Sequence, residues 1–263
     1  MRASPLTQAV ALASLAFLYL PMLAVALFSF NRTRHGLGWG GFTLDWYARL
    51  FQNQALLEAA WNTLLLAFFS TLLATFLGTL LALGLERHPF GRRARAWLET
   101  ALYLPVVTPD LILAAALVVA FSALRLFIPL FEPGLPAMVV GHVTFQVAFV
   151  ALVVMGRLKS LPRELDEAAR DLYATYPDYL RRVLLPLLAP GIVAGAMLAF
   201  TLSLDDFVIS FFTAGPTSQT LPLLIYASTR RGITPEIHAA STLLFLLTVV
   251  LVLGAERFTR RSA

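Results

Sequence analysis

Long apolar runs alternate with short charged segments along almost the whole chain. Each run holds about 20 residues, and a helix of that length spans the roughly 30 Å hydrocarbon core of a bilayer. Within lipid the backbone must satisfy its own hydrogen bonds, so we interpret these runs as helices. Six membrane-spanning helices are expected, at about residues 8–30, 60–85, 100–124, 135–156, 187–213 and 238–257. The pattern therefore predicts an all-α integral membrane protein.

The basic residues are distributed unevenly between the two sides that these helices define. With both termini in the cytoplasm, fourteen of the 20 lysines and arginines lie inside and six outside. This bias is the usual signature of orientation, so we predict that both termini are cytoplasmic. An alternative for the first run is a cleaved secretory signal. The run stays apolar to Phe30, beyond the usual length of such a signal, which favours a retained helix.

The composition narrows the class of protein further. Of the 263 residues, 59% are hydrophobic and 13% are charged, which excludes a soluble domain. The absence of cysteine excludes disulfides and thiolate metal sites. The net charge of +5 follows from the cytoplasmic bias, so nucleic acid is not an expected partner. The sequence has no glycine-rich phosphate loop, so we do not expect this chain to bind ATP.

The longest strongly charged interval, residues 157–186, lies between the fourth and fifth runs on the predicted cytoplasmic side. Its pattern predicts two short helices joined by a turn, with Thr175 and Asp178 resembling a capping box at the start of the second. We expect Pro186 and Pro190 to disturb that second helix. An apolar stripe at helical spacing runs along the first: Leu165, Ala168, Ala169 and Leu172. From the pattern alone, an ordinary basic loop is the simpler interpretation.

The third run contains an acid, Asp110, just after Pro105 and Pro109. Each proline removes a backbone hydrogen bond, so we expect this helix to bend or loosen. Counting along the run places Asp110 near the middle of the membrane, where an ionisable group is costly unless it faces protein or water. Asp110 is therefore a candidate for a solute path. The alternative is an acid that is satisfied by backbone groups freed at Pro109.

The fifth run carries two adjacent acids, Asp205 and Asp206, which point about 100° apart on a helix. Ser203, Asp206, Ser210 and Thr213 follow a spacing of 0, +3, +7 and +10, which predicts a continuous polar stripe. We expect Asp206, with Ser203 and Ser210, to line a solute path. Asp205 is a weaker candidate that can instead cap a helix or pair with a neighbour. If the helix ends sooner, both acids lie at the outer interface.

The fourth run holds His142 and Gln146, one helical turn apart and therefore on one face. We expect a buried, hydrogen-bonded pair between helices. A metal site is not expected, because no carboxylate or second histidine stands at ligand spacing.

The charged interval resembles the EAA loop of ABC importer permeases. The resemblance rests on Glu167-Ala168-Ala169, then Val183, Leu185-Pro186 and Pro190. The family pattern has glycine where this chain has Tyr173. Glycine permits a positive φ that tyrosine resists, so the geometry of the turn is where this chain departs from the pattern. Three later segments resemble spermidine/putrescine permeases in particular: FTLSLDDFVISFFTAGP, LPLLIY and GITPEIHAASTL.

The resemblance implies a type I ABC importer permease fold in a single domain, residues 1–263. Core helices would occupy about 60–257, with a peripheral first helix at 8–30. Residues 157–186 would couple to an ATPase. The coupling residues implied are Glu167, Ala168, Ala169, Tyr173, Leu185 and Pro186. The implied partners are a second permease subunit, two ATPase subunits, an external substrate-binding protein and the bilayer of the bacterial inner membrane.

The resemblance also implies the activity, which is ATP-driven import of polyamines by alternating access. ATP and magnesium would bind in the ATPase, so no cofactor and no catalytic residue are expected here. Another small solute is an alternative, such as an aminoalkylphosphonate, an amino-acid-like compound or ferric iron. A self-contained channel or secondary transporter would need its own ion site and usually inverted repeats, which we do not find. Outside, Arg230 and Arg231 are expected to face the binding protein or lipid headgroups.

Overall fold

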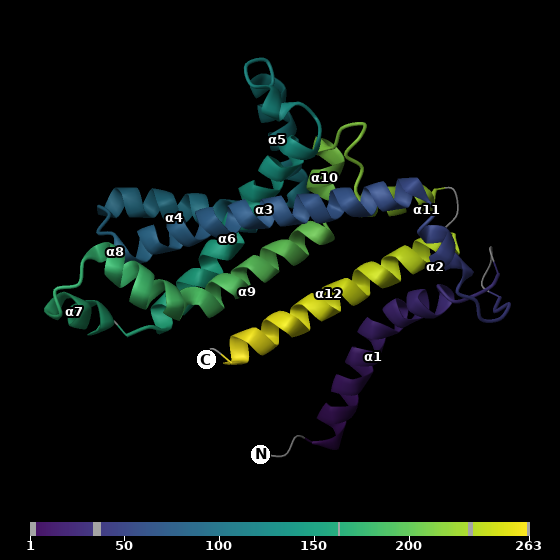
Figure 1. Ribbon diagram of the computed structural model, residues 1–263, viewed down its shortest axis with the longest axis horizontal. Helices are drawn as coiled ribbons and strands as arrows, with labels where there is room; N and C mark the ends of the chain where they lie inside the picture. The colour runs from purple at the N-terminus through teal and green to yellow at the C-terminus, as the bar shows by residue number, and fades with distance from the viewer. Residues whose placement is uncertain (1–3, 34–37, 163, 231–233, 262–263) are drawn as a thin grey trace. The chain divides into compact units, whose positions relative to one another are not determined.

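The computed structural model describes residues 4–33, 38–162, 164–230 and 234–261, and most of them are helical (Figure 1). The elements are α1 (Pro5–Phe28), α2 (Asp45–Leu50), α3 (Gln54–Arg87), α4 (Arg92–Val107), α5 (Asp110–Leu124), η1 (Pro129–Phe131), α6 (Leu135–Ser160), α7 (Glu164–Asp171), α8 (Tyr176–Tyr179), η2 (Leu180–Leu184), α9 (Leu185–Leu204), α10 (Val208–Thr213), α11 (Leu221–Thr229) and α12 (Pro235–Arg261). Within the described ranges, the β structure is an isolated bridge between Asn31 and Phe42. The expected all-α class is confirmed.

Among the residues that the structure describes, five helical segments are long and apolar enough to cross a membrane, and a sixth span arises if the bent pair α4–α5 counts as one. The bend expected in the third predicted helix is confirmed, because α4 ends at Val107 and α5 leaves at an angle of 113°. The bend lies at Thr108 and Pro109, where a missing N–H and a clash with the preceding turn favour a break. Asp110 begins α5 at this corner and is exposed.

The disturbance expected at Pro186 and Pro190 takes the form of a changed turn and not of an end, because the helix continues from Tyr176 to Leu204 through both prolines. The turn just before Pro186, Leu180–Leu184, is a π-helix. Proline has no N–H, so it cannot bond the carbonyl four residues earlier. In a π-turn the hydrogen bonds join residues five apart, which gives such carbonyls other partners. The segment that contains α8 thereby runs without a break into α9.

The chain forms two compact units, which we describe separately. The first contains residues 1–58 and 224–249. In it the loop after α1 is held by buried polar contacts: the Trp46 indole donates to the carbonyl of Asn31 at 2.7 Å, and the hydroxyls of Ser29 and Tyr47 lie 2.7 Å apart. The side chains of α1 are mostly exposed, as expected of a helix that faces lipid.

The second unit contains residues 59–223 and 250–263. Here α3, α4, α6 and α9 run side by side, and α5 projects from them with α10 packed against it (Figure 1). Val150 of α6 lies between glycines of two neighbouring helices. A Cβ on Gly78 of α3 would lie 2.8 Å from the Val150 Cβ, and one on Gly195 of α9 would lie 3.2 Å from its Cγ1. Glycine is thus required at position 78 and favours the close approach of α9 to α6 at position 195.

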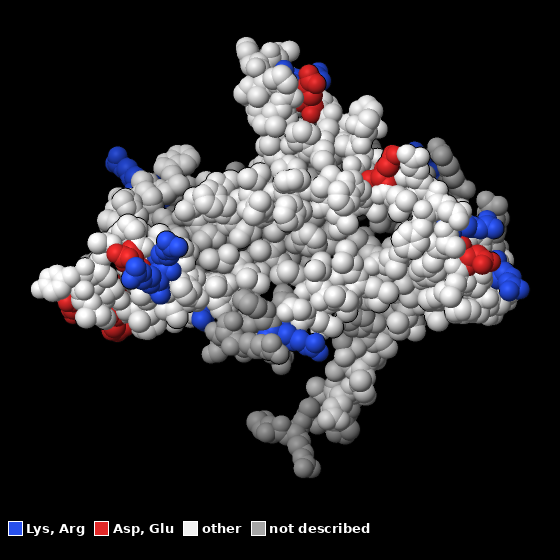
Figure 2. All heavy atoms as spheres, viewed as in Figure 1, with Lys and Arg blue, Asp and Glu red and all other residues white. Residues whose placement is uncertain are grey.

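Charged side chains of the second unit lie at the α7–α8 end, where basic and acidic atoms are found together, and again at the tip of α5, while the surface over the middle of α3 is uncharged (Figure 2). An uncharged belt next to a charged end is the expected surface of a membrane helix bundle with a loop in water.

The turn after α7 adopts a left-handed conformation at Tyr173, whose φ is 53°. The N–H of Ala174 donates to the carbonyl of Ala169 at 2.9 Å, which is the bond of a Schellman motif with Tyr173 in the position that glycine usually occupies. The chain therefore makes the helix–turn–helix of the loop with a tyrosine, at the cost of backbone strain. The ring of Tyr173 is 94% exposed.

We predict that Tyr173→Gly is more stable than Tyr173→Ala. Both variants remove the exposed ring, but only glycine relieves the strain. The expected difference is roughly 0.5–1 kcal/mol, because the left-handed conformation costs an L-residue about 1–2 kcal/mol and the greater unfolded-state entropy of glycine offsets part of it. Thermal unfolding of the purified protein in detergent measures the difference. Equal midpoints would show that position 173 carries no strain.

Candidate functional site

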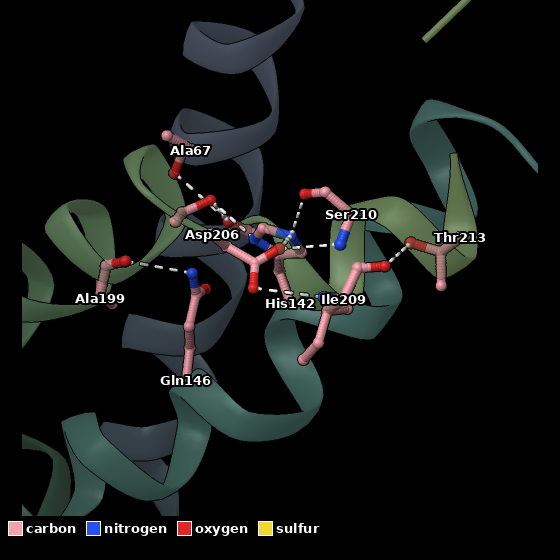
Figure 3. Close-up of polar contacts among 10 residues, drawn as sticks. Ala67, His142, Gln146, Ala199, Asp206, Ile209, Ser210 and Thr213 are labelled. Carbon is pink, nitrogen blue, oxygen red and sulfur yellow. Dashed lines mark hydrogen bonds and ion pairs between the residues drawn. The ribbon is translucent and has the colours of Figure 1, made fainter. Parts of the chain in front are cut away.

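A polar cluster around His142 lies among the apolar helices of the second unit (Figure 3). His142 of α6 is fully buried. Its Nδ1 is 2.8 Å from the hydroxyl of Ser203, at the end of α9. Its Nε2 is 3.1 Å from the hydroxyl of Ser210 in α10 and 3.2 Å from a carboxylate oxygen of Asp206, in the link between these helices. One histidine thus contacts the end of one helix, the start of the next and the link between them.

The link itself explains why the predicted continuous helix 187–213 is wrong. Helix α9 ends at Leu204 and α10 begins at Val208, so backbone N–H groups at the start of α10 lack helical partners. The Asp206 carboxylate supplies the missing partners. It accepts hydrogen bonds from the N–H of Ile209 at 3.3 Å and from the N–H of Ser210 at 2.8 Å. In lipid such groups have no water to bond, so the break depends on this carboxylate.

The break changes the predicted polar stripe without dispersing it. Ser203, Asp206 and Ser210 still converge, although on His142 rather than along one helix face. Thr213 takes no part and donates to the carbonyl of Ile209 at 2.7 Å. On the opposite side of Ser203, the hydroxyl of Ser70 from α3 lies 3.3 Å away. The cluster therefore joins α3, α6, α9 and α10.

The two adjacent acids differ in exposure. The Asp206 side chain is 11% exposed, whereas Asp205 is an exposed residue. Asp110 also lies apart from the cluster, at the α4–α5 corner, and makes no hydrogen bond or ion pair within the described part of the chain. The structure thus brings together Ser203, Asp206 and Ser210 among the predicted path residues and does not bring Asp110 to them.

Gln146, one turn along α6 from His142, is buried and donates from Nε2 to the carbonyl of Ala199 in α9 at 3.1 Å. Both residues of the predicted pair are therefore buried and bonded to a neighbouring helix. Sequence reasoning placed them on one face but did not find the partners of His142, which come from residues more than 60 positions later. The sequence held one indication of these contacts. The histidine and the polar stripe both lie in apolar runs, where buried polar groups need hydrogen-bond partners.

The coupling loop presents a second set of predicted residues. Glu167 and Ala168 of α7 are exposed, while Ala169 packs partly against the apolar core. Leu172 is 81% exposed, next to the exposed ring of Tyr173. Leu185 is half-buried and Pro186 is exposed. Glu167, Leu172 and Tyr173 thus face outward in the isolated chain, whereas Ala169 and Leu185 are partly covered.

Of the two outer arginines, Arg230 places its guanidinium 5.6 Å from the centre of the Tyr226 ring. Its companion, Arg231, lies outside the described residues.

Comparisons with known proteins agree with this architecture. The model of the family of binding-protein-dependent transport system inner membrane components matches residues 74–262. The spermidine/putrescine transport system permease protein PotC of Escherichia coli (strain K12) is 38% identical over 245 residues, which are 93% of this chain and 90% of PotC. The putrescine transport system permease protein PotI of the same strain is 39% identical over 244 residues, 92% of this chain and 86% of PotI.

Among solved structures, a bacterial ABC transporter involved in the import of the acidic polysaccharide alginate contains a chain with the same fold. The TM-score is 0.75 at 23% identity, over 97% of this chain and 95% of the other. The helices, the cluster and these matches define an ABC importer permease, a transport subunit that passes several times through the bacterial inner membrane. The chain belongs to the family of binding-protein-dependent transport system inner membrane components. A self-contained channel or secondary transporter is thereby set aside.

We predict that His142→Leu destabilises the protein more than Gln146→Leu does. Loss of His142 leaves the Ser203 and Ser210 hydroxyls and the Asp206 carboxylate short of a buried partner, whereas loss of Gln146 affects one carbonyl. The expected costs are roughly 3 and about 1 kcal/mol. Thermal unfolding in detergent, with the two variants side by side, provides the comparison. Equal losses would mean that the cluster does not hold α9 and α10 to α6.

Proposed function

We propose that this chain is one of two permease subunits of an ATP-driven importer of polyamines such as putrescine and spermidine. The observation that carries the proposal is the 38–39% identity to PotC and PotI, which extends over more than nine-tenths of the chain. Two copies of an ATPase, which would hold ATP and magnesium, would act from the cytoplasm. An external binding protein would deliver the solute.

The coupling loop is where the ATPase would act. Glu167 is exposed on α7 and has no partner among the described residues, so its charge is available to a basic residue of the ATPase. The exposed apolar side chains of Leu172 and Tyr173 would fill a groove on the same partner. Closure of the ATPase dimer would push this loop and rock the helices between outward-open and inward-open states.

The solute path would pass the acids of the bundle. A polyamine carries two to four positive charges, and a carboxylate at membrane depth lowers the barrier to such a cation. In the arrangement described here the Asp206 carboxylate is shared between His142 and two N–H groups of α10. An ammonium group of the solute could replace His142 at that carboxylate. Asp110 and Asp205, both exposed in the isolated chain, would serve as further cation sites.

We predict that Glu167→Arg abolishes uptake of labelled putrescine by the reconstituted complex with its binding protein, because it places like charges at the contact with the ATPase. Membrane insertion should be unchanged. The matched control is Glu164→Arg, which reverses an exposed charge one turn earlier on the same short helix and should keep most of the uptake. Equal effects of the two reversals would refute a specific coupling role for Glu167.

Asp206→Asn is expected to slow polyamine uptake about tenfold, a rise of ~1.4 kcal/mol in the barrier, because the amide lacks the charge and its single oxygen can accept only one of the two backbone N–H groups. Asp205→Asn should have a much smaller effect, since Asp205 is exposed and outside the cluster. Initial rates with putrescine and spermidine give both numbers. If wild type transports neither polyamine while the assembled complex still hydrolyses ATP, the solute is a different one.

A further inference from the structure

Asp166, the residue just before Glu167, connects the coupling helix to two other helices at once. One carboxylate oxygen pairs with the guanidinium of Arg87, in the last turn of α3. The other accepts a hydrogen bond from the hydroxyl of Tyr179, at the end of α8. The side chains of Arg87 and Asp166 are 15% and 23% exposed, and Tyr179 is buried. We call these three residues the Asp166 clasp.

The apolar packing beneath α7 is incomplete, which gives the clasp its importance. A pocket lies between this helix and the bundle, and the three clasp residues line it together with Ala169, Ala174, Tyr176 and Leu184. Helix α7 has only eight residues, so its own hydrogen bonds hold it weakly. At its C-terminal end the connection is the strained turn at Tyr173. The clasp therefore spans a gap that side-chain packing leaves open.

Both helices that the clasp reaches lead to the His142 cluster. Arg87 ends α3, and Ser70 of the same helix lies 17 residues earlier, a distance of about 26 Å along the axis. Tyr179 lies near the start of the helical stretch Tyr176–Leu204, which continues without a break past Ser203. Ser70 and Ser203 meet in the cluster, with their hydroxyls 3.3 Å apart.

We propose that the Asp166 clasp makes α7 move as one body with α3 and α9, so that a push on the exposed face of α7 reaches the His142 cluster. Without the clasp, the turn at the C-terminal end of α7 would absorb the displacement. Arg87, Asp166 and Tyr179 are then positioning residues that set how much solute moves for each ATP hydrolysed. This inference rests on the proposed function of the loop as the ATPase contact.

The chain offers a matched control beside the clasp. Glu86, next to Arg87 on α3, lies 3.5 Å from the amine of Lys159, which belongs to α6 rather than α7. Lys159→Gln breaks this neighbouring ion pair at the same end of the bundle without touching the clasp. It should leave coupling unchanged, which separates the effect of the clasp from a general loss of charge.

The first experiment measures putrescine transported per ATP hydrolysed in proteoliposomes that contain the whole complex and its binding protein. Asp166→Ala should lower this ratio about fivefold while ATP hydrolysis stays near the wild-type rate. Tyr179→Phe, which removes only one hydroxyl, should lower it less. Arg87→Lys should retain most of the ratio, because the charge pair with Asp166 can still form. An unchanged ratio in Asp166→Ala, or an equal fall in transport and hydrolysis, would overturn the proposal.

A second experiment reads the clasp directly and does not depend on the identity of the solute. Because the chain has no cysteine, spin labels can be placed on Glu164→Cys in α7 and His88→Cys just beyond α3. Pulsed electron resonance should give one narrow distance distribution in the otherwise unchanged protein and in Lys159→Gln, and a broad one in Asp166→Ala and Tyr179→Phe. A narrow distribution in both clasp variants would contradict the proposal. If polyamine transport fails but the broadening appears, the substrate assignment fails and the clasp stands.

Discussion

The carboxylate of Asp206 is the group on which the centre of the bundle depends. A membrane helix that stops and restarts exposes N–H groups that lipid cannot satisfy, and here one side chain accepts two of them. The same carboxylate contacts His142, which is in turn bonded to the serines on either side of the break. The break in the helix and the polar cluster are therefore one feature, and neither could exist in lipid without the other.

The α7–α8 end of the same unit carries a short helix that must remain attached to the helices of the bundle. Apolar packing contributes through Ala169, but a pocket remains underneath, and the ionic contact of Asp166 with Arg87 spans it. The charge of Glu167 remains outside. Adjacent acids thus have opposite orientations in the loop, as Asp205 and Asp206 have at the other end of α9.

The sequence was sufficient for the helical class and for most spans, because long apolar runs leave no other way to satisfy the backbone. The sequence did not predict the structure correctly where a contact between distant residues outweighs the local helical periodicity. The spacing of Ser203, Asp206 and Ser210 suggested one helix, since periodicity cannot reveal that a carboxylate caps a second one. Pro186 suggested a disturbance in the helix. Its form could not be predicted, because a π-turn leaves no sequence pattern of its own. The role of His142 needed partners from α9 and α10, and a single sequence does not pair distant residues. The orientation of the termini and the coupling role of Glu167 stay predictions.

The glycines on either side of Val150 limit how the second unit can change shape. With α3 and α9 both close to α6 at this point, rotation of α3 or α9 about its own axis would bring a larger side chain, in place of the glycine, against the valine. Such rotation is thus opposed at Val150, and bending is easier where the helices are interrupted, at Thr108–Pro109 and around Asp206. In a transport cycle these two interruptions would therefore act as the hinges of the chain.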